Sequence, residues 1–248
     1  MKKFLIFAAT ALLIMQSGTA QNLHIYCEDS AQFLTPEGKS GSLDVEIVSE
    51  IQRRVGNTDA IQFVPWTRGL KYLESETNAI LFSMARSKER NDQYQWIGPI
   101  SESVYGFYAK ADSPVVINSL DDARILPSIG VYRNDIRDQF LSKEGFTNLD
   151  RAANNLSNLK KLMAGRVAVI ASTSLAIKSE AKRVGYRLKD VKFLYGFLKL
   201  PIYIAASKST DPRIVANWNA ALDSMKKDGT LKKIFESYLA DADFPGDG

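Results

Sequence analysis

The first hundred residues alternate between short apolar runs and amphipathic stretches, and this alternation restricts the fold more than any other feature. The runs at 23–26, 61–64 and 79–83 have the length and composition of strands. Between them lie two stretches with helical spacing, 45–55 and 69–76. A strand–helix–strand–helix–strand order predicts a parallel sheet with helices on its faces, which is an α/β fold.

A second alternation of the same kind occupies the rest of the chain. It predicts strands over 103–109, 128–132, 167–171, 191–195 and 202–206, and helices around 136–141, 156–163, 212–225 and 231–238. Another helix is predicted to begin at 172–174. No internal repeat and no low-complexity linker separates the two units. We therefore expect the chain to pass between them on two strands rather than on a flexible tether.

Residues 1–20 have the form of a secretory signal peptide. Lys2 and Lys3 precede a twelve-residue apolar run, 4–15, and small residues stand at −3 (Gly18) and −1 (Ala20) from the predicted cleavage point. Twelve apolar residues are too few to span a bilayer. We therefore expect an exported, periplasmic chain without stable membrane insertion.

Charge and residue counts argue against several classes of function. Without the two lysines of the leader, 30 basic residues stand against 28 acidic ones and are interspersed with them, which gives no support for a nucleic-acid partner. The chain has one histidine, His24, and one cysteine, Cys27, so it lacks the material for an internal disulfide, a His/Cys metal site or a Ser–His triad. We expect no metal, no cofactor and no catalytic residue.

Polar side chains follow the predicted strands at their carboxyl ends, the edge where parallel sheets bind ligands. Guanidinium groups and hydroxyls at such an edge suit a carboxylate. Arg86 and Arg90 are spaced by four, so the alternative is two solvated charges on one helical face. The candidates are Glu28, Asp29, Trp66, Arg68, Ser83, Arg86, Ser87 and Arg90 in the first unit, and Arg133 and Thr173 in the second.

Several short segments, in this order, resemble those of one family. They are Gly41-Ser42-Leu43-Asp44-Val45-Glu46, Pro65-Trp66-Thr67-Arg68, Ser87-Lys88-Glu89-Arg90, Trp96-Ile97-Gly98-Pro99, Leu120-Asp121-Asp122, Gly130-Val131, Leu162 to Arg166, and Asp228-Gly229-Thr230-Leu231. Together they resemble the bacterial periplasmic solute-binding proteins of the amino-acid-binding type, solute-binding protein family 3. These are receptors that deliver ligands to ABC importers.

The resemblance implies a two-lobe periplasmic binding protein of type II. Each lobe would be a mostly parallel sheet flanked by helices, and two hinge strands would join the lobes. Lobe I is expected over 21–102 and 209–239, lobe II over 103–208, and a C-terminal tail over 240–248. The ligand would lie between the lobes and be enclosed by hinge closure.

The resemblance also implies roles for single residues. Arg90 matches the family arginine that grips the ligand α-carboxylate, Ser87 a hydroxyl just before it, and Trp66 an aromatic wall, while Arg133 and Thr173 would close from lobe II. Thr173 falls where amino-acid receptors carry an aspartate for the α-ammonium. Since a buried ammonium without a carboxylate is costly, an anion suits the site better than a zwitterion. Glu28, Asp29 and Asp135 remain alternatives for an ammonium.

The expected function is therefore a monomeric receptor, not an enzyme, for a small carboxylate-bearing ligand, with an ABC transporter permease as partner. Two alternatives stay open. The same fold is known by resemblance from cyclohexadienyl dehydratases, which use a cleft acid. Glu28 could serve as that acid here, although no further motif supports this alternative. The second alternative is a soluble receptor that presents its closed form to a membrane sensor. The sequence does not distinguish such a receptor from a transport receptor.

Overall fold

The computed structural model describes residues 22–28 and 42–239. Three of the sequence-based predictions lie outside these residues. They are the signal peptide over 1–20, the candidate ligand contact Asp29, and the C-terminal tail over 240–248.

The described strands form one sheet in the order β2-β1-β3-β8-β4-β7-β5-β6. At one end β1 pairs in parallel with β2 and β3, and at the other β5 pairs in parallel with β6 and β7. Antiparallel pairs join β3 to β8, β8 to β4 and β4 to β7. The strands are β1 (His24–Glu28), β2 (Ile61–Val64), β3 (Ala79–Ala85), β4 (Gln95–Lys110), β5 (Ile129–Tyr132), β6 (Leu149–Ala152), β7 (Val169–Ser172) and β8 (Val191–Ala206).

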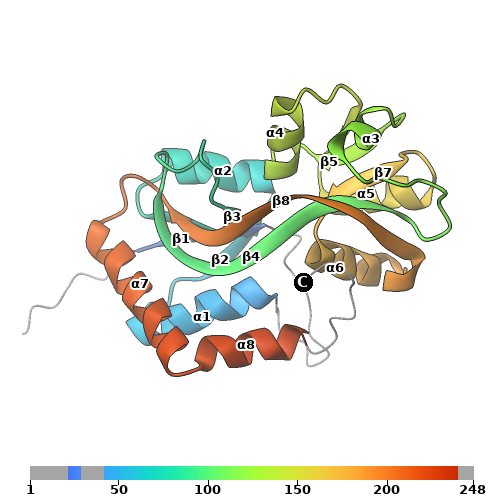
Figure 1. The fold of residues 1–248 in the computed structure, drawn as a ribbon. Coiled ribbons are helices and arrows are strands. Elements are labelled where there is room, and N and C mark those ends of the chain that lie inside the picture. The colour runs from blue at the N-terminus through green and yellow to red at the C-terminus, as the bar shows by residue number, and fades with distance from the viewer. Residues whose placement is uncertain (1–21, 29–41, 240–248) are drawn as a thin grey trace, which may run out of the picture.

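Two long antiparallel strands, β4 and β8, connect the parallel ends of the sheet (Figure 1). Their pairing runs from Gln95 opposite Ala206 to Lys110 opposite Val191. The predicted passage on two strands is thus confirmed. The expectation of short separate strands over 191–195 and 202–206 is wrong, because β8 continues through both.

The helices lie on the faces of the sheet. In Figure 1, α1, α7 and α8 lie on one side of the long strands, and α2 and α4 lie on the other. We call β1 to β3 with α1, α2, α7 and α8 the first lobe, and β5 to β7 with α3 to α6 the second lobe. The helices are α1 (Leu43–Val55), α2 (Trp66–Ser75), α3 (Leu120–Arg124), α4 (Ile136–Lys143), α5 (Asn155–Met163), α6 (Ser174–Val184), α7 (Pro212–Lys227) and α8 (Thr230–Leu239), with a short 3-10 helix, η2, at Leu188–Asp190.

Local sequence signals fix where several helices begin and end. The Ser42 hydroxyl accepts the backbone N–H of Val45 at the start of α1, and Gly56 ends that helix at a φ of 68°. Asp135 and Thr173 accept backbone N–H groups in the same way at the starts of α4 and α6. Both caps follow strands of the second lobe, so they place the ends of β5 and β7 beside helix N-termini.

Each lobe has its own apolar clusters. In the first lobe, Ile47 and Trp218 are buried with side chains of β1 and β3. In the second lobe, Phe107, Val131 and Leu141 are buried together. None of the helices within residues 22–28 and 42–239 combines the length and apolar composition that crossing a membrane requires.

Candidate functional site at the junction of the lobes

Arg90 is a buried cation that lies where the two lobes meet. It follows β3 in a turn and is only 5% exposed. Its Nη1 donates to the Ala85 carbonyl oxygen at 3.3 Å, and its Nη2 donates to Gln139 Oε1 of α4 at 3.1 Å. Among the described residues, no carboxylate lies within 4 Å of the guanidinium. The direct hydrogen-bond partners of this charge are therefore neutral oxygens.

Burial lowers the pKa of Arg90, and the nearby charge of Asp135 opposes that shift. The guanidinium nevertheless stays charged at any physiological pH. A buried charge that is not paired with an opposite charge carries an uncompensated desolvation cost. An anion reaching Arg90 would offset this cost.

Trp66 joins the two lobes and stands beside Arg90. It begins α2, is 6% exposed, and its ring centre lies 5.7 Å from the guanidinium carbon of Arg90. Its backbone N–H donates to the Tyr132 hydroxyl at 3.2 Å, and its indole N–H donates to the Asn134 carbonyl oxygen at 3.4 Å. Trp66 thus contacts Tyr132 and Asn134 of the second lobe and lies beside Arg90.

Ser83 is held in an unusual backbone conformation within β3. Its φ is 62°, and the pairing of β3 with β8 shifts register between Leu81 and Met84. Its hydroxyl donates a hydrogen bond to Oδ2 of Asp44 on α1. Burial raises the pKa of Asp44, although the hydrogen bond from Ser83 acts in the opposite direction. The Ser83 side chain is therefore directed to Asp44.

Ser87 lies in the turn before Arg90 and is buried. The neighbouring Glu89 accepts from the Lys143 ammonium of α4 at 2.5 Å, an exposed ion pair between the lobes. Lys143 first, and then the backbone N–H of Glu89 itself, lower the pKa of Glu89 to about 2. The turn at 87–90 thus contacts α4 through both Glu89 and Arg90.

Arg86 does not share the surroundings of Arg90. Its Nε and Nη2 donate to Asn91 Oδ1 at 2.9 and 2.6 Å. Its guanidinium carbon lies 5.4 Å from the ring centre of Trp96 and 5.2 Å from that of Tyr203. These rings belong to β4 and β8, so the guanidinium of Arg86 contacts side chains of the two long strands.

The remaining predicted site residues have other surroundings. Arg68 on α2 and Arg133 after β5 are exposed. The Thr173 hydroxyl accepts the backbone N–H of Ala176 at 3.2 Å and caps α6. Glu28 ends β1 with its Oε1 buried. The structure thus brings Trp66, Ser87 and Arg90 together, and nothing in it joins Arg68, Arg133 or Thr173 to them.

The structure adds residues that the sequence analysis did not single out. Arg137, only 5% exposed, donates from Nε to Asp135 Oδ2 at 2.7 Å and from Nη2 to the same oxygen. Burial alone would lower the pKa of Arg137, but Asp135 raises it, with smaller contributions from Tyr105 and Glu28. Gln139 on the same helix bonds Arg90. An Asp-x-Arg-x-Gln pattern at a helix start after a strand was the available signal.

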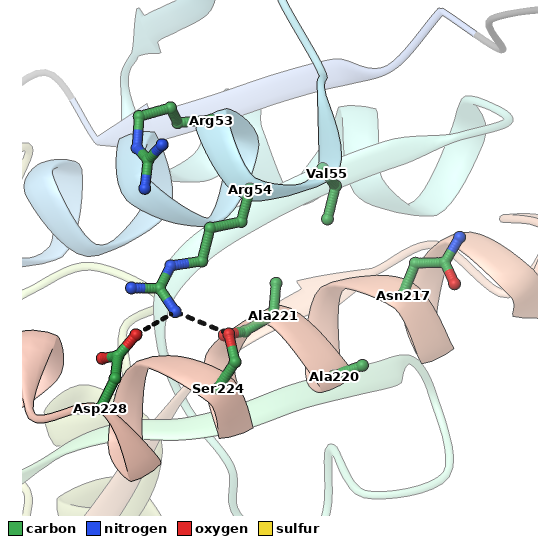
Figure 2. A pocket seen from close by; sticks show the side chains of 8 residues that line it. All are labelled: Arg53, Arg54, Val55, Asn217, Ala220, Ala221, Ser224 and Asp228. Carbon is green, nitrogen blue, oxygen red and sulfur yellow. Dashed lines mark hydrogen bonds and ion pairs between the residues drawn. The ribbon is translucent and has the colours of Figure 1, made fainter.

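A surface hollow elsewhere in the first lobe contains none of the predicted site residues. It lies between the end of α1 and the helices α7 and α8 (Figure 2). Arg54 reaches across it to Asp228 and Ser224, both at 2.7 Å. Within residues 22–28 and 42–239 there is also no cluster of three His, Cys, Asp or Glu side chains that could hold a metal ion.

Comparisons with known proteins agree on a family and a fold. The profile of the bacterial extracellular solute-binding proteins, family 3, matches residues 28–241. The chain is 23% identical over 256 residues to the probable amino-acid-binding protein YxeM of Bacillus subtilis (strain 168), and the match covers 96% of each chain.

Three solved structures share the fold. A histidine kinase sensor domain with similarity to periplasmic binding proteins matches with a TM-score of 0.79 at 19% identity, covering 88% of this chain and 96% of that one. An ancestral arginine-binding protein bound to glutamine gives 0.76 at 22%, covering 88% and 97%. An ancestral amino acid-binding protein, a precursor of cyclohexadienyl dehydratase, gives 0.73 at 20%, covering 87% and 94%. These likenesses confirm the predicted fold class.

Proposed function

The chain belongs to the bacterial extracellular solute-binding proteins, family 3, and we propose that it captures a small carboxylate-bearing ligand between its lobes. The ligand would be an amino acid or a related polar metabolite. The chain would act in the periplasm, after removal of residues 1–20, and would pass the ligand as a monomer to the permease of an ABC importer. The name of its Bacillus subtilis relative, a probable amino-acid-binding protein, is in keeping with this proposal.

One observation carries the proposal. Arg90 is buried at the junction of the lobes, and in the described part of the chain its guanidinium bonds only to neutral oxygens, those of Ala85 and Gln139. A ligand carboxylate would supply the missing negative charge and accept two parallel hydrogen bonds from the guanidinium fork. Trp66, whose ring lies beside Arg90, would cover the apolar part of the ligand.

Capture would follow from movement of the lobes about β4 and β8. Contacts from both lobes converge on Arg90 and Trp66, so closure would surround a ligand held there. The proposal divides the chain into two moving lobes. Lobe I would comprise 21–102 and 209–239, and lobe II would comprise 103–208. Ser83, Ser87 and Glu28 would line the first-lobe side, together with Asp29.

The descriptions of two similar structures suggest two other candidate functions. A soluble receptor for a membrane sensor is the second candidate, because a histidine kinase sensor domain is among the similar structures. A dehydratase-like enzyme is the third, because a precursor of cyclohexadienyl dehydratase is another. Turnover of prephenate or arogenate by the purified chain would establish the enzyme. A permease gene beside this one would favour transport over sensing.

Ligand binding is tested by a thermal-shift screen of amino acids, dicarboxylates, polyamines and small peptides, followed by calorimetry. The Arg90→Ala variant should bind the best carboxylate at least about tenfold more weakly, since a charge-assisted hydrogen bond contributes roughly 1.5–3 kcal/mol. Arg90→Lys should lose much of the affinity as well, because a lysine has no bidentate fork.

The matched control is Arg68→Ala, which removes an exposed arginine from the first lobe. It should leave the dissociation constant within about twofold of the wild-type value. Melting curves of each variant without ligand separate loss of binding from loss of folding. An unchanged dissociation constant in a folded Arg90→Ala variant would show that Arg90 does not hold the ligand.

A further inference from the structure

Gln139 of α4 is bonded from the second lobe to the buried guanidinium of Arg90. Its Oε1 accepts from Arg90 Nη2 at 3.1 Å. Nη2 takes part in both arrangements by which a guanidinium holds a carboxylate with two parallel hydrogen bonds, one shared with Nη1 and the other with Nε. The Ala85 carbonyl oxygen, which accepts from Nη1 at 3.3 Å, belongs to the first lobe like Arg90 itself. Gln139 is therefore a second-lobe group on the nitrogen that a ligand carboxylate needs.

The orientation of the Gln139 amide follows from its two partners. Its Nε2 donates to the Asn134 carbonyl oxygen at 3.2 Å, while Oε1 faces Arg90. Since a guanidinium only donates and a carbonyl only accepts, the reversed amide would make neither bond. The indole N–H of Trp66 donates to the same carbonyl oxygen at 3.4 Å, and its ring centre lies 5.7 Å from the guanidinium carbon. Gln139, Asn134, Trp66 and Arg90 thus form a closed ring of contacts between the lobes.

The Gln139 side chain can leave Arg90 at low cost. Gln139 and Asn134 are both exposed, so water can take over the hydrogen bonds of the amide once it turns away. A guanidinium bonds a carboxylate more strongly than a neutral amide oxygen, because both partners are then charged. A ligand carboxylate would therefore replace Gln139 on Arg90. The net gain on binding is reduced by the hydrogen bond that is broken.

We propose, resting on the function proposed above, that Gln139 is an affinity-setting residue that competes with the ligand carboxylate for Arg90. Because the same bond is broken whatever the ligand, Gln139 lowers the affinity of every ligand that Arg90 holds by the same factor. A glutamine that instead contacted the ligand would add affinity, by an amount that depends on the structure of the ligand. The two roles predict effects of opposite sign.

Calorimetry on the mature wild-type chain and on Gln139→Ala tests the inference. The probes are succinate, glutarate, glutamate and alanine, together with every other carboxylate that binds in the thermal-shift screen. Gln139→Ala should bind each of these ligands about three- to tenfold more tightly, the usual net worth of one hydrogen bond, and by the same factor within about twofold. Gln139→Glu places a carboxylate beside Arg90 and should bind each of them at least about tenfold more weakly. Gln139→Met, which also lacks the acceptor, repeats the measurement if Gln139→Ala does not fold.

The matched control is Lys143→Ala, one helical turn further along α4. Lys143 also bonds across the lobes, to Glu89 Oε1 at 2.5 Å, but this exposed pair does not involve Arg90. Its loss should leave the affinity the same or up to about threefold lower, and should not raise it.

Melting curves without ligand establish that each variant is folded. A folded Gln139→Ala that binds the probes no more tightly than the wild type overturns the inference. So does a gain that Lys143→Ala reproduces or that differs severalfold between probes. The proposed receptor stands in each of these cases if Arg90→Ala loses binding in the same experiment. Absence of binding by every carboxylate of the screen overturns the proposed function and the inference with it.

Discussion

Asp44 and Ser83 form a half-buried pair, and the ionisation of Asp44 acts on the stability of the first lobe. The Asp44 side chain points from the first turn of α1 to the Ser83 hydroxyl, and burial raises its pKa above the ordinary value of 3.8. The folded protein therefore binds a proton at Asp44 more tightly than the unfolded chain does. Stability attributable to this carboxyl is greatest below pH 3.8 and falls as the pH rises through the raised pKa.

Asp44→Asn should raise the free energy of unfolding at pH 7, by about 1 kcal/mol or more, because the amide has the shape of the carboxyl and no charge to bury. At pH 3 the variant and the wild type should differ little. Urea denaturation at the two pH values measures both differences. Asp112→Asn, at an exposed carboxylate, is the control and should change stability little at either pH. If the variant is less stable than the wild type at pH 7, the ionised form of the Asp44 carboxylate stabilises the folded protein, which contradicts this prediction.

Single residues at the junction were only partly predictable. Arg90 was identified as the principal clamp, and the structure buries it beside Trp66. Arg137 was not identified, since the Asp-x-Arg-x-Gln pattern at the start of α4 does not say by itself how that helix start is buried. Arg86 and Arg90 share a helical spacing in sequence, but residues 86–94 form no helix, so the two side chains have different neighbours.

One side chain of helix α1, that of Arg54, bonds to residues of both C-terminal helices, α7 and α8. Arg54 bonds Ser224 on α7 and Asp228 between α7 and α8 (Figure 2). It also bonds Glu50 within α1 and Thr230 at the start of α8. The pKa of Glu50 is lowered to about 2, first by Arg53 and then by Arg54. The contribution of this carboxylate to stability is complete above pH 4.5 and is lost as the pH falls towards 2.

Arg54→Met should lower the free energy of unfolding by about 1–3 kcal/mol, because the bonds that Arg54 makes to α7 and α8 are lost together. Denaturation in urea measures the change. Arg53→Ala, at a neighbouring arginine whose side chain is 70% exposed, is the matched control and should cost much less. Ligand affinity should be unchanged in both variants, since Arg90 lies elsewhere. A large loss of affinity in folded Arg54→Met would place the hollow of Figure 2 in the ligand site instead.

The boundaries of the helices and strands show which local sequence signals were sufficient to predict where an element begins or ends. Local rules placed α1 and β2 well, since Gly56 ends the first and Pro65 follows the second. The long strands were predicted as fragments, because glycine and proline at 98–99 and at 196 and 201 are typical of strand ends. In the sheet, β4 and β8 absorb these residues by shifts of register, including those at Ile97/Ser101 and Tyr105/Gly106. β4 pairs with β7 and β8, and β8 pairs with β3 and β4. This pairing continues each long strand past the glycine and proline positions where its own sequence predicts an end.

At the scale of the whole molecule, the lobes meet through apolar contacts, those of Ile136 and Tyr132 with first-lobe clusters, and through direct polar contacts. The hydrogen bonds of Trp66 to Tyr132 and Asn134, that of Arg90 to Gln139, and the exposed pair of Glu89 with Lys143 are such contacts. Contacts of this kind can be broken without unfolding either cluster, so we expect the lobes to part about β4 and β8. Residues from both lobes would then be exposed together when a ligand enters.

The crystal structure of the mature chain with a carboxylate identified in the screen tests the central claim most directly. The account predicts that the ligand carboxylate lies about 2.7–3.2 Å from the guanidinium nitrogens of Arg90. It also predicts that Trp66 covers the ligand and that α4 contacts it from the second lobe. A ligand bound elsewhere, for example in the hollow beside Arg54, or a carboxylate bound at the junction without contact to Arg90, would contradict the account.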